Sequence, residues 1–421
     1  MKRYLAIVAA LLCLSLTLTA CGGQTTNSGD TGSEEVTLTF WLIDPFTKAQ
    51  DAPIYQAIAD FEKANPGIKV DIQPMATNVI HDKIVTAISG GQGPDVVSID
   101  IAWCGEFIAM DLLADITEEF GPYKDEFMDG PLSAVTRDGK LYAVPWYTNN
   151  VALYYNVEAF EKAGITNPPS TWNELVDVAK KLKEAGYYAI SIGRGGYGTY
   201  FFLPFLFQNR GRVFAEDNKT LVVNSPEAVE AFEFYTGLYT ELHAIPEDVK
   251  SAFSWDEIYA PFLQERAAML ISGDWAKFTI ENSAPDLKWA VAPLPKGKTA
   301  ATVAGGYNLA ISKNTKHKEA AWKLIRYLTD HDGMKILEQY SRIAARKDVV
   351  DTEYAKKDPF VSTFVQQAPL GIPQPTNAAW PKINDLIGDA FDAVIQGQKT
   401  PKEALDEVVA KGQPLVDSIV Q

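Results

Sequence analysis

Cysteine and histidine are both scarce in this chain of 421 residues, which contains three cysteines and four histidines. Cys13 lies within an apolar N-terminal segment and Cys21 directly after it, so Cys104 is the only thiol in the remaining body. A disulfide inside that body is therefore excluded. The histidines lack the spacing of metal ligands, and we expect neither a metal site nor a cofactor. They are His81, His243, His317 and His331.

Basic residues are outnumbered, with 38 lysines and arginines against 54 aspartates and glutamates and a formal net charge of −16. This acidity argues against nucleic acid and anionic lipid surfaces as partners, although solubility alone also explains it. Enzyme signatures are missing as well. There is no nucleophile elbow, His-Glu-x-x-His or Ser-x-x-Lys motif with its partners, and the glycine-rich residues 193–198 lack the Lys-Ser/Thr ending of a phosphate loop.

The apolar run at the N-terminus is short. Residues 5–18 are almost continuously apolar, which gives ~14 residues where a membrane span needs ~20. Residues 2–3 are basic and residues 19–20 are small, the layout of a secretory signal peptide, with an uncut membrane anchor as the alternative. Residues 18–21, Leu-Thr-Ala-Cys, resemble a bacterial lipobox, in which the cysteine is lipidated and becomes the first mature residue.

We therefore predict a signal peptide over residues 1–20 and a lipid such as palmitate on Cys21. Residues 21–35 contain, after the cysteine, only Gly, Ser, Thr, Asn, Gln, Asp and Glu, so we expect them to form a flexible tether. Loss of the signal peptide leaves 36 basic against 54 acidic residues, a net charge of −18. The expected location is extracytoplasmic, on the outer face of the plasma membrane or in a periplasm.

Strand-like and helix-like segments alternate after the tether. Residues 35–44 alternate apolar and polar side chains as strands do, and residues 54–61 place apolar side chains at helical spacing before an Asn-Pro-Gly stop. A strand, a helix and a strand follow up to Asp100, and the pattern predicts an α/β domain with a largely parallel sheet. Thr171 and Glu174 form a predicted capping box. About 400 mature residues suggest two domains.

Several segments, taken in order, resemble one known family. They are GPDVVSID and DLLADIT, AVPWYTNNVALYYNVEAFEKAGI and PPSTWNEL, ERAAMLISGDWA, APLPKG, VAGGYNLAISKNTKHKEAAWKLIRYLT, ARKDV, DPFVSTFVQQA, and NAAWPKINDLIGDAFDAVIQGQKTPKEALDEV. Together they resemble family 1 of the bacterial extracellular solute-binding proteins, which includes the maltose-binding protein and serves ABC importers of carbohydrates. The resemblance covers roughly residues 36–415.

The resemblance implies a two-lobed α/β fold of the periplasmic-binding-protein type (type II-like), with three hinge crossings and a ligand cleft between the lobes. Ligand binding would close the cleft by a hinge motion. The crossings are expected near residues 144–150, 303–309 and 344–349. The expected lobes are an N-terminal lobe of residues 36–146 plus 305–346 and a C-terminal lobe of residues 147–304 plus 347–421.

A carbohydrate has apolar C–H faces and polar hydroxyls at its edge, so its site needs aromatic platforms and fixed hydrogen-bonding groups. The carboxyl ends of the predicted strands lie at the edge where α/β sheets bind ligands. Residues there are Trp41, Asp44, Asn78, Asp100 and Trp103. The crossings contribute Trp146, Asn149, Gly306, Tyr307 and Arg346. The resemblance adds Tyr200 and Trp380, which match aromatic ligand positions of the maltose-binding relatives, and Trp275, which in the family stacks on the sugar.

Many of these candidates have a structural alternative that the sequence leaves open. Trp41 and Asp44 are also explained by loop packing, and Asn78 by a helix cap. Gly306 suits either a close approach of the backbone to a ligand or flexibility of the hinge. Arg346 is equally explained by a surface salt bridge.

We expect a lipid-anchored solute receptor that captures a mono- or oligosaccharide and delivers it to the membrane subunits of an ABC permease. It would act as a monomer and not as an enzyme. Two alternatives remain open. A lipid-anchored glycoside hydrolase needs two carboxylates across one bond, which 54 acids could always supply. A sugar receptor that signals to a sensor kinase would have the same sequence. Neutral sugars are favoured because only Arg346 and Arg194 are basic candidates for the cleft.

Overall fold

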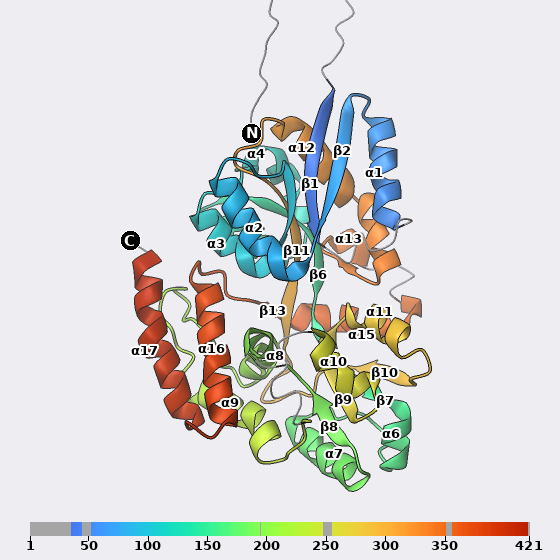
Figure 1. Ribbon diagram of the computed structural model, residues 1–421, viewed down its shortest axis with the longest axis vertical. Coiled ribbons are helices and arrows are strands. Elements are labelled where there is room, and N and C mark those ends of the chain that lie inside the picture. Colours follow the sequence, from blue (N-terminus) through green and yellow to red (C-terminus); the bar gives the residue numbers. More distant parts are fainter. Residues whose placement is uncertain (1–34, 44–51, 194, 247–254, 351–355, 420–421) are drawn as a thin grey trace, which may run out of the picture. The chain divides into compact units, whose positions relative to one another are not determined.

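The computed structural model describes residues 35–43, 52–193, 195–246, 255–350 and 356–419. The predicted signal peptide, Cys21 and the tether up to residue 34 lie outside these described residues, as do Asp44 and Arg194. Two sheets and one two-stranded hairpin organise the described part of the chain (Figure 1).

The larger sheet has the strand order β12-β6-β11-β3-β1-β2, with β13 paired to β11. β1 is parallel to β2 and β3, as predicted from the alternation of strands and helices along the chain. By contrast, β11 runs antiparallel to β3 and β6. Parallel neighbours need crossover connections, and two helices supply them. The strands are β1 (Val36–Ile43), β2 (Ile68–Met75), β3 (Val96–Asp100), β6 (Ala143–Asn149), β11 (Thr302–Ile311), β12 (Ile343–Ala344) and β13 (Gly371–Pro373).

The smaller sheet has the strand order β10-β7-β9-β8. β9 is buried along its whole length between β7 and β8, which explains its continuous apolar run. The strands are β7 (Val151–Asn156), β8 (Tyr188–Ser191), β9 (Ala267–Gly273) and β10 (Trp289–Ala292). The separate hairpin consists of β4 (Thr136–Arg137) and β5 (Lys140–Leu141).

Helices surround both sheets (Figure 1). Those associated with the larger sheet are α1 (Pro53–Ala64), α2 (Thr77–Ser89), η1 (Ile101–Trp103), α3 (Cys104–Ala109), α4 (Thr117–Phe120), η2 (Gly121–Glu126), α5 (Asp129–Ala134), α12 (Lys318–Thr329), η4 (Gly333–Tyr340) and α13 (Lys347–Val350). The others are α6 (Val157–Lys162), α7 (Trp172–Glu184), α8 (Gly195–Gln208), α9 (Pro226–Thr240), α10 (Trp255–Leu263), α11 (Ala276–Ser283), α15 (Pro359–Gln367), η5 (Ala368–Leu370), α16 (Trp380–Ile395) and α17 (Pro401–Ile419).

The predicted cap of α7 is present. The Thr171 hydroxyl accepts a hydrogen bond from the Glu174 backbone N–H at 3.2 Å. The Glu174 carboxylate in turn accepts from the backbone N–H and the hydroxyl of Ser170, both at 2.7 Å. The capping box therefore extends to the residue before the cap, and it fixes the entry of the chain into α7.

Two hydrophobic cores form, one on each sheet, which matches the two-lobed α/β fold predicted from the sequence. A single residue, Asn150, separates β6 from β7, so the chain passes directly from one sheet to the other. The crossing strands contribute to both cores: Tyr147 packs in the core of the larger sheet, while Val303 and Ile343 pack in that of the smaller one. The boundaries of the two lobes at single-residue precision stay a prediction.

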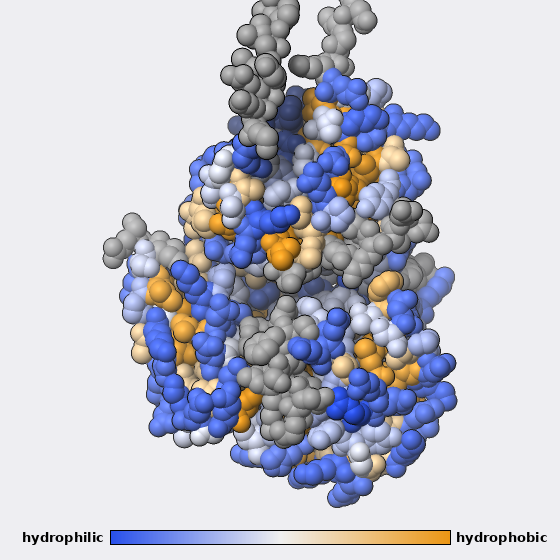
Figure 2. Space-filling model, in the orientation of Figure 1, coloured by the Kyte–Doolittle hydropathy of each residue, from blue (hydrophilic) through white to orange (hydrophobic). Residues whose placement is uncertain are grey.

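Within the described residues, no helix is long and apolar enough to cross a membrane. Hydrophilic residues cover most of the face shown in Figure 2, and apolar residues form small separate patches on it. Among the large apolar side chains that remain exposed, Phe278 on α11 has the highest exposed fraction, 63%. Scattered single exposures of this kind are normal on a globular surface.

Candidate functional site

Three aromatic rings meet where β3, β11 and β6 lie side by side. Tyr307 of β11 pairs with Asp100 of β3 on one side and with Tyr147 of β6 on the other. The rings of Tyr147 and Tyr307 are stacked, with centroids 5.6 Å apart and an interplanar angle of 22°. The ring of Trp103, from η1, meets Tyr307 edge-on at 6.2 Å. The sheet register thus places a row of aromatic rings at the carboxyl end of β3.

The close packing of this row depends on a glycine. Gly306 has a φ of 135°, a backbone conformation that L side chains rarely adopt. A Cβ atom there would lie only 2.2 Å from the Tyr147 carbonyl oxygen. The strand register also shifts between Tyr307 and Asn308, which marks a bulge. The close approach predicted for Gly306 is therefore made to the neighbouring strand of the protein itself.

A second aromatic group gathers at the end of β9. The ring of Trp275 lies directly over Gly273, where a Cβ atom would come within 1.9 Å of it. Trp275 also contacts Tyr200 at a centroid distance of 6.2 Å and Trp255 at 5.5 Å. The Tyr200 hydroxyl donates a hydrogen bond to the Asn149 side-chain oxygen at 3.1 Å. This group is thereby tied to the end of β6.

A buried ion pair joins the two aromatic groups. Arg342 Nη1 lies 3.0 Å from Asp274 Oδ1, and the side chains are 7% and 1% exposed. The Arg342 guanidinium lies 5.7 Å from the ring of Tyr147 in the first group, while Asp274 directly precedes Trp275 in the second. Burial raises the pKa of Asp274 to about 6, and the attraction of Arg342 opposes that rise. The carboxylate form of Asp274 therefore depends on Arg342.

Asp100 is the second buried carboxyl group at this place. Burial raises its pKa to about 6, against the stabilising hydrogen bond from the Ala102 backbone N–H at 2.8 Å. That bond makes Asp100 the cap of η1, and the Tyr307 hydroxyl also interacts with the carboxylate. Asp100 is thus held in place from two sides, as a fixed hydrogen-bonding group requires.

We call the following residues the candidate site: Asp100, Trp103, Tyr147, Asn149, Tyr200, Asp274, Trp275, Gly306, Tyr307 and Arg342. Most of them were expected from the sequence, and the contacts above bring them together. Chemically they combine aromatic rings with a buried cation, two buried carboxyl groups and an amide. Such a set suits a neutral ligand with apolar faces and a polar edge.

The structure gives other partners to four of the predicted residues. The Trp41 indole N–H donates to Gln73 at 2.9 Å. Arg346 forms ion pairs with Glu126 at 2.6 Å and Asp348 at 2.9 Å, but it is buried, so this is not the surface salt bridge of the alternative. Trp146 is fully buried in the core of the larger sheet, and Trp380 is buried in that of the smaller one. Asn78 lies in α2, but its side chain is outside the described residues, as is the whole of Asp44.

Arg342 and Trp255 were not among the residues selected from the sequence. Arg342 lies just before the third crossing expected near residues 344–349, which carries Arg346, and the sequence offers no sign of which arginine turns toward Asp274. Trp255 opens α10, and its ring contacts Trp275 of the site. Both depend on tertiary packing that local sequence patterns do not report.

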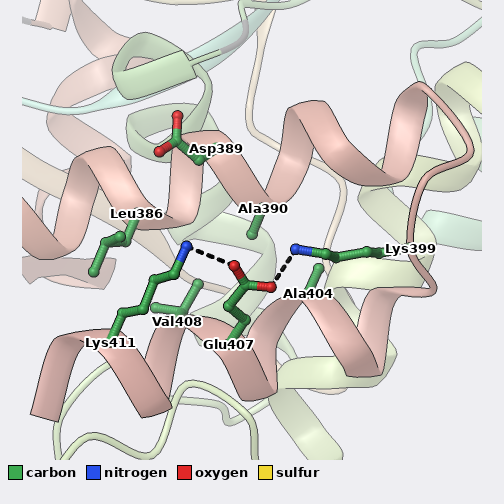
Figure 3. A pocket seen from close by; sticks show the side chains of 8 residues that line it. All are labelled: Leu386, Asp389, Ala390, Lys399, Ala404, Glu407, Val408 and Lys411. Atoms are coloured by element: carbon green, nitrogen blue, oxygen red, sulfur yellow. Dashed lines mark hydrogen bonds and ion pairs between the residues drawn. The ribbon is translucent and has the colours of Figure 1, made fainter.

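A small pocket lies away from the candidate site, between α16 and α17 (Figure 3). Its volume is about 50 Å³, room for a few water molecules. Figure 3 shows Glu407 between Lys399 and Lys411, with which it forms ion pairs. Figure 2 shows the apolar strip between these two helices flanked by hydrophilic residues. The pocket is too small for a sugar and holds none of the predicted residues.

Comparison with known proteins decides the family. The sequence profile described as bacterial extracellular solute-binding protein matches residues 47–335, more than half of the chain. The chain belongs to this family. Membership places it outside the cytoplasm, and the family and the neighbours below are binding proteins rather than enzymes.

Relatives of this solute-binding protein cover nearly all of it. A putative binding protein of Brucella abortus is 27% identical over 402 residues, 93% of this chain and 95% of the relative. A solved ABC transporter solute-binding protein from Thermotoga lettingae, bound to α-D-tagatose, is 29% identical with a TM-score of 0.82 and covers 90% of this chain and 100% of its own. The maltose-bound MalE3 of T. maritima is 28% identical with a TM-score of 0.80 and the same coverage.

Proposed function

We propose that this family member is the lipid-anchored substrate-binding protein of an ABC importer, and that it captures a carbohydrate by hinge closure and delivers it to the permease. The observation that carries the proposal is the candidate site, in which aromatic rings and buried polar groups from both sheets converge. The tagatose- and maltose-bound relatives support a carbohydrate ligand.

The expected contacts follow from the chemistry of a sugar ring. Trp275, Tyr200 and Trp103 provide aromatic faces for the apolar C–H surface. Asp100 and Asn149 provide fixed groups for the hydroxyls, and an incorrect ligand leaves such buried groups unpaired. Because Arg342 is already paired with Asp274, the site has no spare cation among its described residues for an anionic ligand. A neutral mono- or oligosaccharide is therefore favoured.

A thermal-shift screen against a carbohydrate panel tests the proposal. A ligand present at 100 times its dissociation constant stabilises the folded protein by about 2.7 kcal/mol, which raises the melting temperature measurably. At least one neutral carbohydrate is expected to do this, and peptides and divalent metals serve as controls. A shift with a peptide or metal and with no carbohydrate would refute the assignment, and turnover of a glycan would refute the non-enzymatic role.

The anchor is proposed from the sequence alone, because residues 1–34 are outside the described part. Cells that express the protein with radiolabelled palmitate should label it, and Cys21→Ala should abolish the label and release the protein from the membrane. Cys13→Ala, which changes a thiol inside the predicted signal peptide, is the matched control and should keep the label. Labelling that survives Cys21→Ala would exclude this anchor.

A further inference from the structure

His81 lies on α2, outside the candidate site, between two carboxylates. Its Nε2 is 2.9 Å from Glu106 Oε2, and its Nδ1 is 2.9 Å from Asp82 Oδ1. The Asp82 side chain is 95% exposed, whereas that of Glu106 is 24% exposed. Solvent weakens the first contact far more than the second, so the bond to Glu106 is the stronger one. It ties α2 to α3.

The same imidazole packs directly against the candidate site. Its ring meets the ring of Trp103 at 5.2 Å and 71°, and the ring of Phe107 at 5.2 Å. Phe107 is itself 6.0 Å from Trp103 and fully buried. Tyr307 contacts Trp103 from another side. Trp103 is thus held by three neighbouring rings, of which His81 is the one that can change its charge.

Only the protonated form of His81 satisfies both of its carboxylate neighbours. An imidazolium donates from both ring nitrogens, whereas a neutral imidazole donates from one and turns a lone pair toward the other carboxylate. The hydrogen bond to Glu106 raises the pKa of His81 above its usual 6.5, burial opposes this, and Asp82 adds to the rise. Asp100, at the end of β3, is the further charged group that interacts with it.

We propose that His81 is a positioning residue for ligand binding, because its hydrogen bond to Glu106 fixes the orientation of the Trp103 ring on which the sugar rests. The inference depends on the proposed carbohydrate function. It adds a residue that touches no ligand and predicts how affinity responds to pH.

The direction of the response follows from the raised pKa. Below it, His81 is charged and bonded to both carboxylates, and Trp103 is held. As pH rises through this pKa, the neutral ring keeps one N–H, which stays on the better shielded Glu106, while the contact with the exposed Asp82 loses its donor. The bond to Glu106 is then no longer charge-assisted, so Trp103 is held less firmly and affinity falls by roughly fivefold to tenfold.

The test measures the dissociation constant of the bound carbohydrate by calorimetry between pH 5.5 and 8.5. Wild-type affinity is expected to fall above pH 6.5, whereas His81→Gln should bind more weakly at pH 6.5 and should lack this fall. A change near pH 6 that both proteins share belongs to Asp100 and Asp274, whose pKa values are about 6. His243→Asn is the matched control: His243 is exposed, and its φ of 47° is one that asparagine tolerates. It should reproduce the wild-type profile. A wild-type affinity that stays constant above pH 6.5, or a fall above pH 6.5 that survives in His81→Gln, would overturn the proposal.

A ligand-free measurement separates this inference from the proposed function. The ¹⁵N indole resonance of Trp103, assigned by its loss in Trp103→Phe, should shift with a midpoint above pH 6.5 in the wild type. In Glu106→Gln the midpoint should move down toward 6.5, because the charge that raises it is gone while an acceptor oxygen remains.

The two measurements distinguish failure of the carbohydrate function from failure of the positioning role of His81. If the Trp103 resonance titrates as described but no carbohydrate binds, the carbohydrate function is wrong, and with it the role of His81 in sugar binding. If a carbohydrate binds but the resonance does not respond to pH, the function stands and the positioning role of His81 is refuted. The unfolding midpoints of His81→Gln and Glu106→Gln are measured in parallel, and midpoints close to that of the wild type exclude loss of the fold as the cause.

Discussion

At the residue scale, the position of the Trp275 ring depends on Gly273, because a glycine has no side chain in the space that the ring fills. The ring covers Gly273 so closely that any side chain there would displace it. It also contacts the aromatic rings of Tyr200 and Trp255. A ring held in this way loses little conformational entropy when a ligand stacks on it, which favours tight binding.

We predict that Trp275→Ala lowers carbohydrate affinity by about tenfold or more, because the apolar face of the sugar loses its platform. Phe278→Ala is the control, since Phe278 is an exposed aromatic residue three positions along the chain with no contact to the site among the described residues. Calorimetric titration of both variants decides the point. Equal affinities in the two would remove Trp275 from the site.

The Arg342–Asp274 pair allows a second prediction at this scale. Arg342→Met leaves Asp274 buried without its cation and is expected to lower the free energy of unfolding by about 3–5 kcal/mol. The double variant Arg342→Met with Asp274→Leu should recover most of that loss, because no charge remains buried. Urea unfolding of the wild type, the two single variants and the double variant measures this. Additive losses in the double variant would show that the two side chains are not coupled.

Asp100 makes the stability of the fold depend on pH. Its pKa in the folded protein, about 6, lies above its ordinary value of 3.8, so the native state binds the proton more tightly than the unfolded state. The contribution of Asp100 to stability is therefore complete below pH 3.8 and is lost as pH rises to about 6. Asp100→Asn, which keeps the helix cap, should reduce the fall in unfolding free energy between pH 4 and 7. If the unfolding free energy of Asp100→Asn depends on pH as steeply as that of the wild type, burial does not raise the pKa of Asp100.

At the element scale, β11 determines the geometry of the site. It lies between β3 and β6 and carries Gly306, whose φ and whose distance from the Tyr147 carbonyl both exclude a side chain. We predict that Gly306→Ala lowers the free energy of unfolding by more than about 2 kcal/mol, from backbone strain and overpacking together.

Gly164→Ala is the matched control for Gly306→Ala. Gly164 also has a positive φ, 65°, but no atom lies within 4 Å of the position a Cβ would take. Only the backbone strain applies there, so a loss of about 1 kcal/mol is expected. Chemical denaturation compares the two variants. A loss at Gly306 no larger than that at Gly164 would show that the close contact with Tyr147 relaxes without cost.

The elements themselves were largely predictable from the sequence, and their pairing was not. Period-two alternation predicted β1, and the capping box marked the start of α7 at Thr171. These signals are local. The insertion of β11 between β3 and β6 brings residues that are distant in sequence into register, such as Tyr307 with Asp100 and with Tyr147, and no local pattern encodes this. The expected parallel arrangement therefore holds for β1 to β3 and changes to antiparallel at β11.

The same limit applies to the site. The end of a predicted strand led to Trp103, the second hinge crossing led to Tyr307, and the family resemblance led to Tyr200 and Trp275. Whether an arginine at or just before the third crossing pairs with Asp274 or with Glu126 is decided by packing between segments distant in sequence. Of the aromatic residues expected from the sequence, these four fall within the candidate site, whereas Trp41, Trp146 and Trp380 do not, because packing also decides which rings enter a core.

At the scale of the whole molecule, the account requires the two lobes to close on the ligand. Small-angle X-ray scattering should show a smaller radius of gyration when the carbohydrate is present. The Trp275→Ala variant, at the same ligand concentration, should remain closer to the ligand-free value. An unchanged radius in the wild type with saturating ligand would argue against hinge closure as the mode of capture.

Calorimetric titration of the purified protein with the carbohydrate that gives the largest thermal shift tests the central claim most directly. The account predicts one binding site per chain, and heat of binding that is strongly reduced in Trp275→Ala and retained in Phe278→Ala. Absence of binding to every carbohydrate of the panel, with saturable binding of a peptide or a metal ion instead, would contradict it.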